Sequence, residues 1–267
     1  RIPGVGDTPA GVAGMVVSLG YPTINGDGSV GFNGVAGDVF IWNDGGVAWT
    51  NGDAIGFSLS GVEPTMGISD GGRFIYGTDI DGRDGLWTHL GYLIRADDPA
   101  PGILTALTTF NDVPLMLPDG AIRWVAGYDD DSDGLTDGRM LYASQSGLIG
   151  DATILLQSGD VIGGLTIADD GIERVHAVSS DCAHTVLIVD FDTGSTADDT
   201  AVVVDGAIVQ RESLPNGSGD NWDNFDLVTI NDAGNFLVQA GAYVLADPRA
   251  GAAEDSHQHH LSAGRPL

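Results

Sequence analysis

The acidic run that begins at Asp129 has the spacing of a cation-binding loop. It reads Asp-Asp-Asp-Ser-Asp-Gly-Leu-Thr-Asp, with carboxylates at Asp129, Asp131 and Asp133, a glycine at the next position and a further carboxylate at Asp137. Ca²⁺ takes six to eight oxygen ligands, and carboxylates at alternate positions can converge on one ion where glycine permits a sharp turn. The sequence therefore predicts Ca²⁺ as a cofactor bound by these four aspartates. The alternative is a solvated acidic hairpin.

The loop differs from an EF-hand, because Met140 stands where an EF-hand has its bidentate glutamate. We therefore expect strands rather than helices on both sides of it. Acids recur at what we interpret as the same hairpin of other segments, and these residues form a weaker set of candidate metal ligands: Asp79, Asp81, Asp84, Asp190 and Asp192.

Trp222 is the candidate for ligand binding. It lies in the polar segment Gly-Asp-Asn-Trp-Asp-Asn, and an exposed indole there could stack on a sugar ring. Trp42 and Trp87 are instead expected in the core, since they fall at corresponding places in two similar segments.

Catalytic signatures are sparse. The chain has no Gly-x-Ser-x-Gly elbow, and its single cysteine, Cys182, excludes a disulfide framework and a cysteine-based zinc site. A glycosidase would need an acid paired with a base or nucleophile on neighbouring inner strands. Glu63 and Glu173 are the pair to test for that role.

The elements that must position these residues are short strands. The chain contains 41 glycines, which makes long helices improbable. Between the glycines lie β-branched and aromatic segments that predict strands: residues 38–42, 73–76, 185–189 and 200–204. We expect an all-β protein.

One turn recurs five times, and each copy leads into an apolar strand. The copies are Ile24–Gly28, Ile68–Gly72, Leu117–Gly120, Val178–Cys182 and Ile230–Gly234. Asn, Asp and Gly tolerate positive φ, so the repeat predicts five hairpins. Cys182 then occupies the position that is glycine in the other copies.

The last residues of the five turns lie 44, 48, 62 and 52 residues apart. Units of this length with four strands each are typical of propeller blades. The sequence predicts a five-bladed β-propeller over residues 1–246, closed by the chain termini, with residues near 1–7 beside those near 236–246. Residues 247–267 are expected to form a polar tail. A β-sandwich is the alternative fold.

The best copy of the repeat runs from Pro22 to Phe32 and reads Pro-x-Ile-Asn-x-x-Gly-x-Val-x-Phe, while Gly6 to Gly11 reads Gly-Asp-x-Pro-x-Gly. These motifs resemble the degenerate β-propeller repeats of secreted bacterial proteins. The resemblance covers most of residues 1–245 and implies an extracellular or cell-surface location without a fixed activity. Because the chain begins at Arg1 rather than Met, we expect that a segment upstream of it was removed, by signal cleavage or otherwise.

Charge narrows the possible partners. The chain has 34 Asp, four Glu, ten Arg and no Lys, for a net charge of −28. Such a surface repels phosphate backbones and anionic membranes, and no apolar run is long enough to span a bilayer. We expect a secreted, calcium-stabilised, non-enzymatic module that binds a glycan, a protein or copies of itself. The alternative function is a polysaccharide-active hydrolase or lyase.

Overall fold

The computed structural model describes residues 2–43, 45–51, 56–60, 66–110, 113–217, 219–243 and 258–264, and it leaves the side chains of residues 173–176, 241–243 and 258–264 undescribed. The protein is all-β: 52% of it is strand. The described residues contain no α-helix. The expected strand segments are confirmed by β4, β8, β18 and β19, whose bounds follow. The described part has no helix that is long and apolar enough to cross a membrane.

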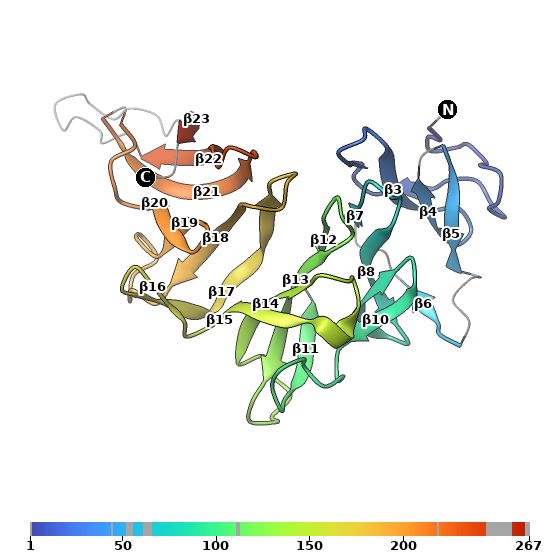
Figure 1. Cartoon of the computed structure of the whole chain (residues 1–267), viewed down its shortest axis with the longest axis horizontal. Coiled ribbons are helices and arrows are strands. Elements are labelled where there is room, and N and C mark those ends of the chain that lie inside the picture. The colour runs from blue at the N-terminus through green and yellow to red at the C-terminus, as the bar shows by residue number, and fades with distance from the viewer. Residues whose placement is uncertain are drawn as a thin grey trace, which may run out of the picture. The chain divides into compact units, whose positions relative to one another are not determined.

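Five antiparallel sheets follow one another along the chain (Figure 1). In each of the first three, a first strand broken into two pieces pairs with the second strand, and two hairpin strands complete the sheet. The first sheet contains β1 (Ser18–Leu19), β2 (Thr23–Ile24), β3 (Val30–Val35), β4 (Val39–Asn43) and β5 (Gly46–Thr50). The second contains β6 (Leu59–Ser60), β7 (Met66–Ile68), β8 (Phe74–Ile80), β9 (Arg83–Thr88) and β10 (Gly91–Arg95). The third contains β11 (Ala106–Phe110), β12 (Leu115–Met116), β13 (Ile122–Asp129), β14 (Gly138–Ser144) and β15 (Thr153–Gln157).

The last two sheets vary this pattern. In the fourth, a continuous first strand carries several register shifts and an extra short strand precedes it. It contains β16 (Val161–Ile162), β17 (Leu165–Val178), β18 (Thr185–Phe191), β19 (Thr200–Val204) and β20 (Ala207–Arg211). The fifth contains β21 (Asn221–Ile230), β22 (Phe236–Tyr243) and β23 (Gln258–Gly264).

The chain forms two compact units, Arg1–Gln157 and Ser158–Leu267. Within the first unit, Ile41 and Trp49 of the first sheet share a core with Trp87 of the second. Leu86 of the second sheet shares another core with Trp124 of the third. Consecutive sheets therefore pack face to face through apolar side chains.

The second unit repeats this packing. Val186 and Val202 of the fourth sheet share a core with Trp222, Phe225 and Val238 of the fifth. The prediction of one domain over residues 1–246 stays a prediction.

The two chain ends differ from expectation. Both edges of β22 are occupied, by β21 and by β23, whereas we expected residues near 1–7 beside this strand. Gly6 and Asp7 instead pair with Val16. Gln258–Gly264, expected as polar tail, forms β23 because its backbone extends the sheet beyond β22. Closure of the ring by the chain termini stays a prediction, whereas Gln258–Gly264 is a strand rather than part of a tail.

The five repeated turns are the strongest confirmation of the sequence analysis. The last residue of each turn has positive φ: +87° at Gly28, +72° at Gly72, +91° at Gly120, +62° at Cys182 and +71° at Gly234. In every copy its backbone N–H donates to the carbonyl three residues earlier, over 2.9 to 3.2 Å. Cys182 therefore takes the backbone conformation of a glycine, as predicted.

Within each unit, equivalent turns of consecutive sheets are hydrogen-bonded to one another at the position two residues before the last residue of the turn. The N–H of Gly26 donates to Oδ1 of Asp70 over 2.7 Å, and the N–H of Asp70 donates to the carbonyl of Pro118 over 3.2 Å. In the second unit, Oγ of Ser180 donates to the Asp232 carboxylate over 2.6 and 2.8 Å. These contacts form what we call the turn column, and they place the repeats in register across sheets.

We predict that Cys182→Gly stabilises the protein. A side chain in the left-handed region costs about 1–2 kcal/mol, and part of that gain is offset by the greater freedom of glycine in the unfolded chain. The free energy of unfolding, measured in urea, should rise by about 0.5–1 kcal/mol. Cys182→Ala keeps a Cβ at φ +62° and serves as the control. Equal stability of the two variants would show that the backbone at this turn is not strained.

Candidate metal centre

The predicted calcium loop is the hairpin between β13 and β14, the second and third strands of the third sheet. Asp129, Asp131 and Asp137 each offer one carboxylate oxygen, and the three oxygens lie within 4.8 Å of one another. Among the described residues no other such group of His, Cys, Asp or Glu occurs. Three of the four predicted ligands are therefore brought together.

Backbone N–H groups hold these carboxylates in place. Asp129 accepts from the N–H groups of Ser132 and Gly134, over 2.6 and 2.8 Å. Asp137 accepts from the N–H of Asp130 over 2.6 Å. Ser132 at φ +64° and Gly134 at φ +86° bend the loop inward. The local sequence thus gives the convergence, because short acidic side chains cap the turn that carries them.

Asp133 lies outside the group of three. Its Oδ1 accepts from the N–H of Leu135 over 2.8 Å, two residues away. Its role as a fourth ligand stays a prediction.

The pKa values of Asp130 and Asp137 are shifted because these two residues lie close together in the loop. Hydrogen bonding to Asp137, together with the charge of that residue, raises the pKa of Asp130. The backbone N–H of Asp130 lowers the pKa of Asp137, which keeps that carboxylate ionised. A bound cation would relieve the repulsion between the carboxylates. The donor set is all oxygen, which suits Ca²⁺ better than a transition metal.

The weaker candidates lie in the corresponding hairpins of the second and fourth sheets. Asp79 and Asp84 face each other across the β8–β9 ladder. Asp81 accepts from the N–H of Ser58 over 2.8 Å and from Arg95 over 2.6 Å; the first of these bonds and then the second lower its pKa. The carboxylate of Asp81 is therefore already paired with the guanidinium of Arg95.

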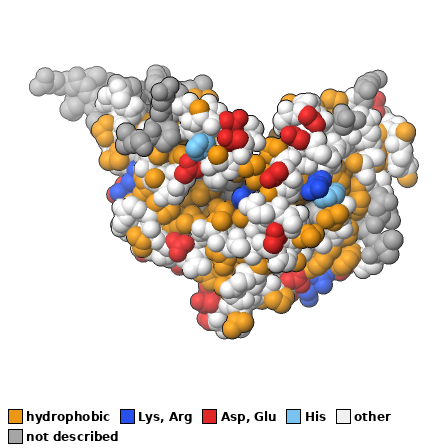
Figure 2. Space-filling model, in the orientation of Figure 1, with side chains coloured by type: hydrophobic (Ala, Val, Ile, Leu, Met, Phe, Trp, Pro, Cys, Tyr) orange, Lys and Arg blue, Asp and Glu red, His pale blue; other side chains and the backbone are white. Residues whose placement is uncertain are grey.

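Asp190 and Asp192 have protein partners as well. Thr200 donates its hydroxyl to Asp190 over 2.7 Å, and the N–H of Asp192 donates to the carbonyl of Thr166 over 2.9 Å. In Figure 2 the acidic side chains form separate small groups over the visible face. A metal at either of these two hairpins stays a prediction.

The proposed ligand residue Trp222 is a core residue, and that prediction is wrong. Its side chain is 2% exposed, its Nε1–H donates to Oε1 of Gln210 over 2.9 Å, and its ring lies 5.6 Å from that of Phe225. The polar neighbours that suggested a loop belong to β21, where side chains alternate between solvent and core. Trp42 and Trp87 are buried on corresponding third strands, as predicted.

The acids proposed for catalysis cannot be placed. Glu63 and the side chain of Glu173 lie outside the described residues.

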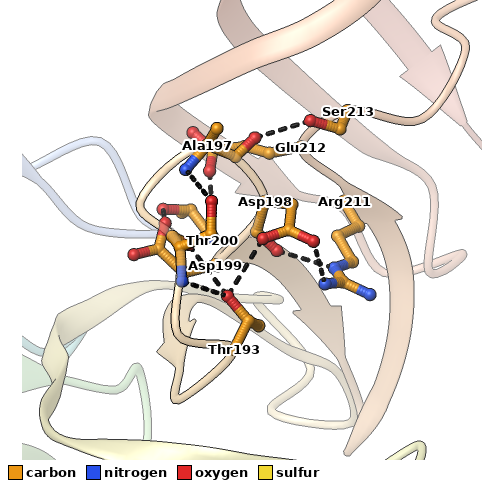
Figure 3. Close-up of polar contacts among 9 residues, drawn as sticks. Thr193, Ala197, Asp198, Asp199, Thr200, Arg211, Glu212 and Ser213 are labelled. Carbon is orange, nitrogen blue, oxygen red and sulfur yellow. Dashed lines mark hydrogen bonds and ion pairs between the residues drawn. The ribbon is translucent and has the colours of Figure 1, made fainter.

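Glu212 is a candidate that the sequence analysis missed. It follows β20, is 5% exposed, and its Oε2 accepts from the N–H of Thr200 over 3.1 Å. Burial raises its pKa to about 7, and the charges of Asp199 and Asp190 act in the same direction. Figure 3 shows this carboxyl among polar contacts that link the loop after β18 to the end of β20. The sequence analysis missed Glu212 because a single glutamate forms no recognisable motif. Its partner Thr200 lies 12 residues away in sequence.

Beside it, Arg211 anchors the same loop. Its Nε donates to the carbonyl of Asp198 over 2.8 Å, and its Nη2 lies 3.1 Å from the Asp198 carboxylate (Figure 3). This ion pair leaves the buried Glu212 without a cationic partner in the part of the chain that the structure describes.

The comparisons with known proteins gave weak structural similarities. No protein-family model and no curated protein matches this chain. A polysaccharide lyase, Uly1, aligns with a TM-score of 0.45 at 12% identity, covering 92% of this chain and 58% of that one. A gluconolactonase, XC5397 from Xanthomonas campestris, aligns with a TM-score of 0.37 at 15% identity, covering 84% of this chain and 72% of that one. The chain thus spans less than two thirds of the length of the lyase. Both TM-scores are below 0.5, so the function proposed next depends on the residues of this chain alone.

Proposed function

We propose that this chain is a secreted, calcium-stabilised β-propeller that acts as a non-enzymatic binding or surface-assembly module for a glycan or protein ligand. Three features of the chain support the propeller fold in this proposal. Its first three sheets repeat one strand order, consecutive sheets pack face to face within each unit, and equivalent turns hydrogen-bond across sheets within each unit. Radial packing of repeated antiparallel sheets is how propellers are built, and a two-sheet sandwich has no need of five equivalent turns.

The observation that carries the calcium part is the convergence of the Asp129, Asp131 and Asp137 carboxylates within 4.8 Å. Without a cation these charges repel one another in a single exposed hairpin. Ca²⁺ that binds the folded state alone adds stability of RT ln(1 + [L]/Kd), about 2.7 kcal/mol at a hundredfold excess over Kd. The hairpin joins the two central strands of the third sheet, so the ion would rigidify that sheet.

We expect a calcium chelator to lower the melting temperature of the parent protein by roughly 5–10 °C. The double variant Asp131→Asn, Asp137→Asn loses two of the three converging charges and should melt at the same temperature with and without chelator. Asp119→Asn is the matched control, because Asp119 belongs to the same sheet but lies outside the acidic loop and accepts from the N–H of Ala121, and it should respond to chelator like the parent. A parent melt that the chelator leaves unchanged would reduce the loop to a solvated acidic turn.

The binding role is tested on the calcium-loaded protein with a panel of neutral and acidic oligosaccharides. We expect at least one to bind and to be recovered uncleaved by mass spectrometry. Shortened products or new unsaturated ends would establish the alternative, a hydrolase or lyase. Sedimentation of the same sample with and without Ca²⁺ separates a monomeric receptor from an assembling subunit.

A further inference from the structure

The first strand of the first sheet, with the residues just before it, carries an exposed row of apolar side chains. We call this row the apolar strip, and its members are Met15 at 57% exposed, Val17 at 61%, Leu19 at 37%, Tyr21 at 69% and Ile24 at 68%. The first four lie at every second position, and alternate side chains of an extended chain point to the same side. Val16, which lies between two of them, is 1% exposed and packs in the core of the first sheet. This segment thus buries one side and exposes an apolar side.

Hydrogen bonds to β3 fix the backbone of the strip. β1 and β2 both pair with β3 in antiparallel register. The N–H of Val17 donates to the carbonyl of Val35 over 2.8 Å, and the N–H of Gly20 donates to that of Asn33 over 2.9 Å. β1 stands at the end of the strand order β1-β3-β4-β5. The strip therefore runs along the edge of a sheet, on a backbone that is already ordered before any partner arrives.

The strip carries no charge. Residues 8–26 contain no Asp, Glu or Arg, and no other run of the sequence without these residues is as long. In a chain with 38 acids and ten arginines, an uncharged exposed segment is an exception. A partner recognised by its positive charge would be drawn to the acids elsewhere on the surface rather than to this segment. The strip therefore suits a partner that meets it through apolar contact.

A second copy of this chain is the partner that the charge pattern favours. Two copies, each with a net charge of −28, repel one another. A two-fold contact brings the same surface of both copies together, so any acid within it would lie near acids of the other copy. Asp7 and Asp27 flank the uncharged run, and the strip lies between them. It can therefore face its own copy without placing carboxylates in the contact.

The size of the strip sets the expected strength of the contact. At their exposed fractions its five side chains present on the order of 500 Å² per copy, since a large side chain covers about 150–250 Å² when complete. Two copies would then bury about 1,000 Å² in total, which is the lower limit for a specific interface. We therefore expect reversible association rather than a permanent dimer.

We propose that the apolar strip is the contact through which two copies of this chain associate, strip against strip, about a two-fold axis. The inference rests on the surface-assembly role proposed above and names the partner of that role. Because the contact contains no charges, added salt should strengthen it by screening the repulsion between the two acidic copies. A contact made by ion pairs would weaken with salt instead.

The test is sedimentation equilibrium of the calcium-loaded protein from micromolar to near-millimolar concentration. We expect a monomer–dimer equilibrium whose Kd falls as sodium chloride is added. Val17→Asp places a charge in the strip and should raise Kd at least tenfold, and Tyr21→Ser, which adds no charge, should raise it at least threefold. Leu104→Asp is the matched control, because Leu104 is fully exposed in the same unit but outside the strip. It adds the same charge as Val17→Asp and should stay within twofold of the parent.

The melting temperature of each variant is measured alongside, so that a change in Kd is read only from variants that melt like the parent. If Val17→Asp and Leu104→Asp raise Kd equally, overall charge rather than the strip governs association, and the strip fails while the assembly role stands. Species larger than dimers would overturn the two-fold arrangement. A parent that is monomeric at every concentration, with and without Ca²⁺, would overturn the strip and the assembly role together. Oligosaccharide binding by that monomer would leave the receptor role intact.

Discussion

Replacing Gly67 with alanine should destabilise the protein by about 3 kcal/mol, the upper part of the range for overpacked cores. Gly67 lies in β7, and a Cβ there would stand 2.3 Å from the backbone N of Met116 in β12 and 2.9 Å from its Cβ. Real Cβ atoms do not approach backbone so closely, and backbone cannot rotate away as a flexible side chain does. The first strands of the second and third sheets would have to separate, which would open the core that contains Met116 and Trp124.

Gly46→Ala is the matched control for this variant. Gly46 also lies in a strand, β5, but no atom lies within 4 Å of its Cβ position. Urea denaturation of both variants should show Gly46→Ala within about 0.5 kcal/mol of the parent and Gly67→Ala far below it. Similar midpoints for the two would contradict the close approach of β7 and β12.

The second large effect concerns pH. The folded-state pKa of Glu212 is raised to about 7, above its ordinary value of 4.5, chiefly by burial. Folding therefore favours the protonated acid. The stability that this proton contributes is fully present below about pH 4.5 and is lost as the pH rises through 7. The rise from 4.5 to about 7 corresponds to about 3 kcal/mol of stability across that window.

Glu212→Gln should remove this dependence. The amide oxygen can still accept from the N–H of Thr200, and the neutral side chain has no charge to desolvate. We expect the free energy of unfolding of the variant to equal that of the parent at about pH 4.5 and to exceed it by about 3 kcal/mol at about pH 8. The difference in the free energy of unfolding between the two proteins is the quantity to plot, because groups distant from residue 212 contribute equally to both and cancel. A difference that stays constant from pH 5 to 8 would show that Glu212 ionises normally.

The repeat was predictable from sequence because turn chemistry is local. A turn of five residues that ends in a positive φ requires glycine or another tolerant residue at its last position. The five turns could therefore be aligned by sequence alone, with Cys182 at the position of the glycines. The convergence of Asp129, Asp131 and Asp137 was predictable for the same reason, since one hairpin supplies all three.

Properties that depend on distant segments were not predictable. Trp222 resembled a loop residue because its neighbours are polar, and only the partners of β21 decide that its indole faces the core. The pKa of Glu212 is raised chiefly by burial and further by the charge of Asp199, which lies in the loop before β19 and distant from Glu212 in sequence.

The turn column has a direction. From Gly26 to Asp70, from Asp70 to Pro118, and from Ser180 to Asp232, the donor belongs to the earlier repeat and the acceptor to the later one. Within each unit, a repeat is thus completed by its successor, which is the nearest-neighbour coupling of quasi-one-dimensional repeat arrays. Amide exchange should report this polarity: the Gly26 and Asp70 amides should exchange only when the following repeat opens. Loss of a repeat should therefore loosen the turn before it more than the turn after it.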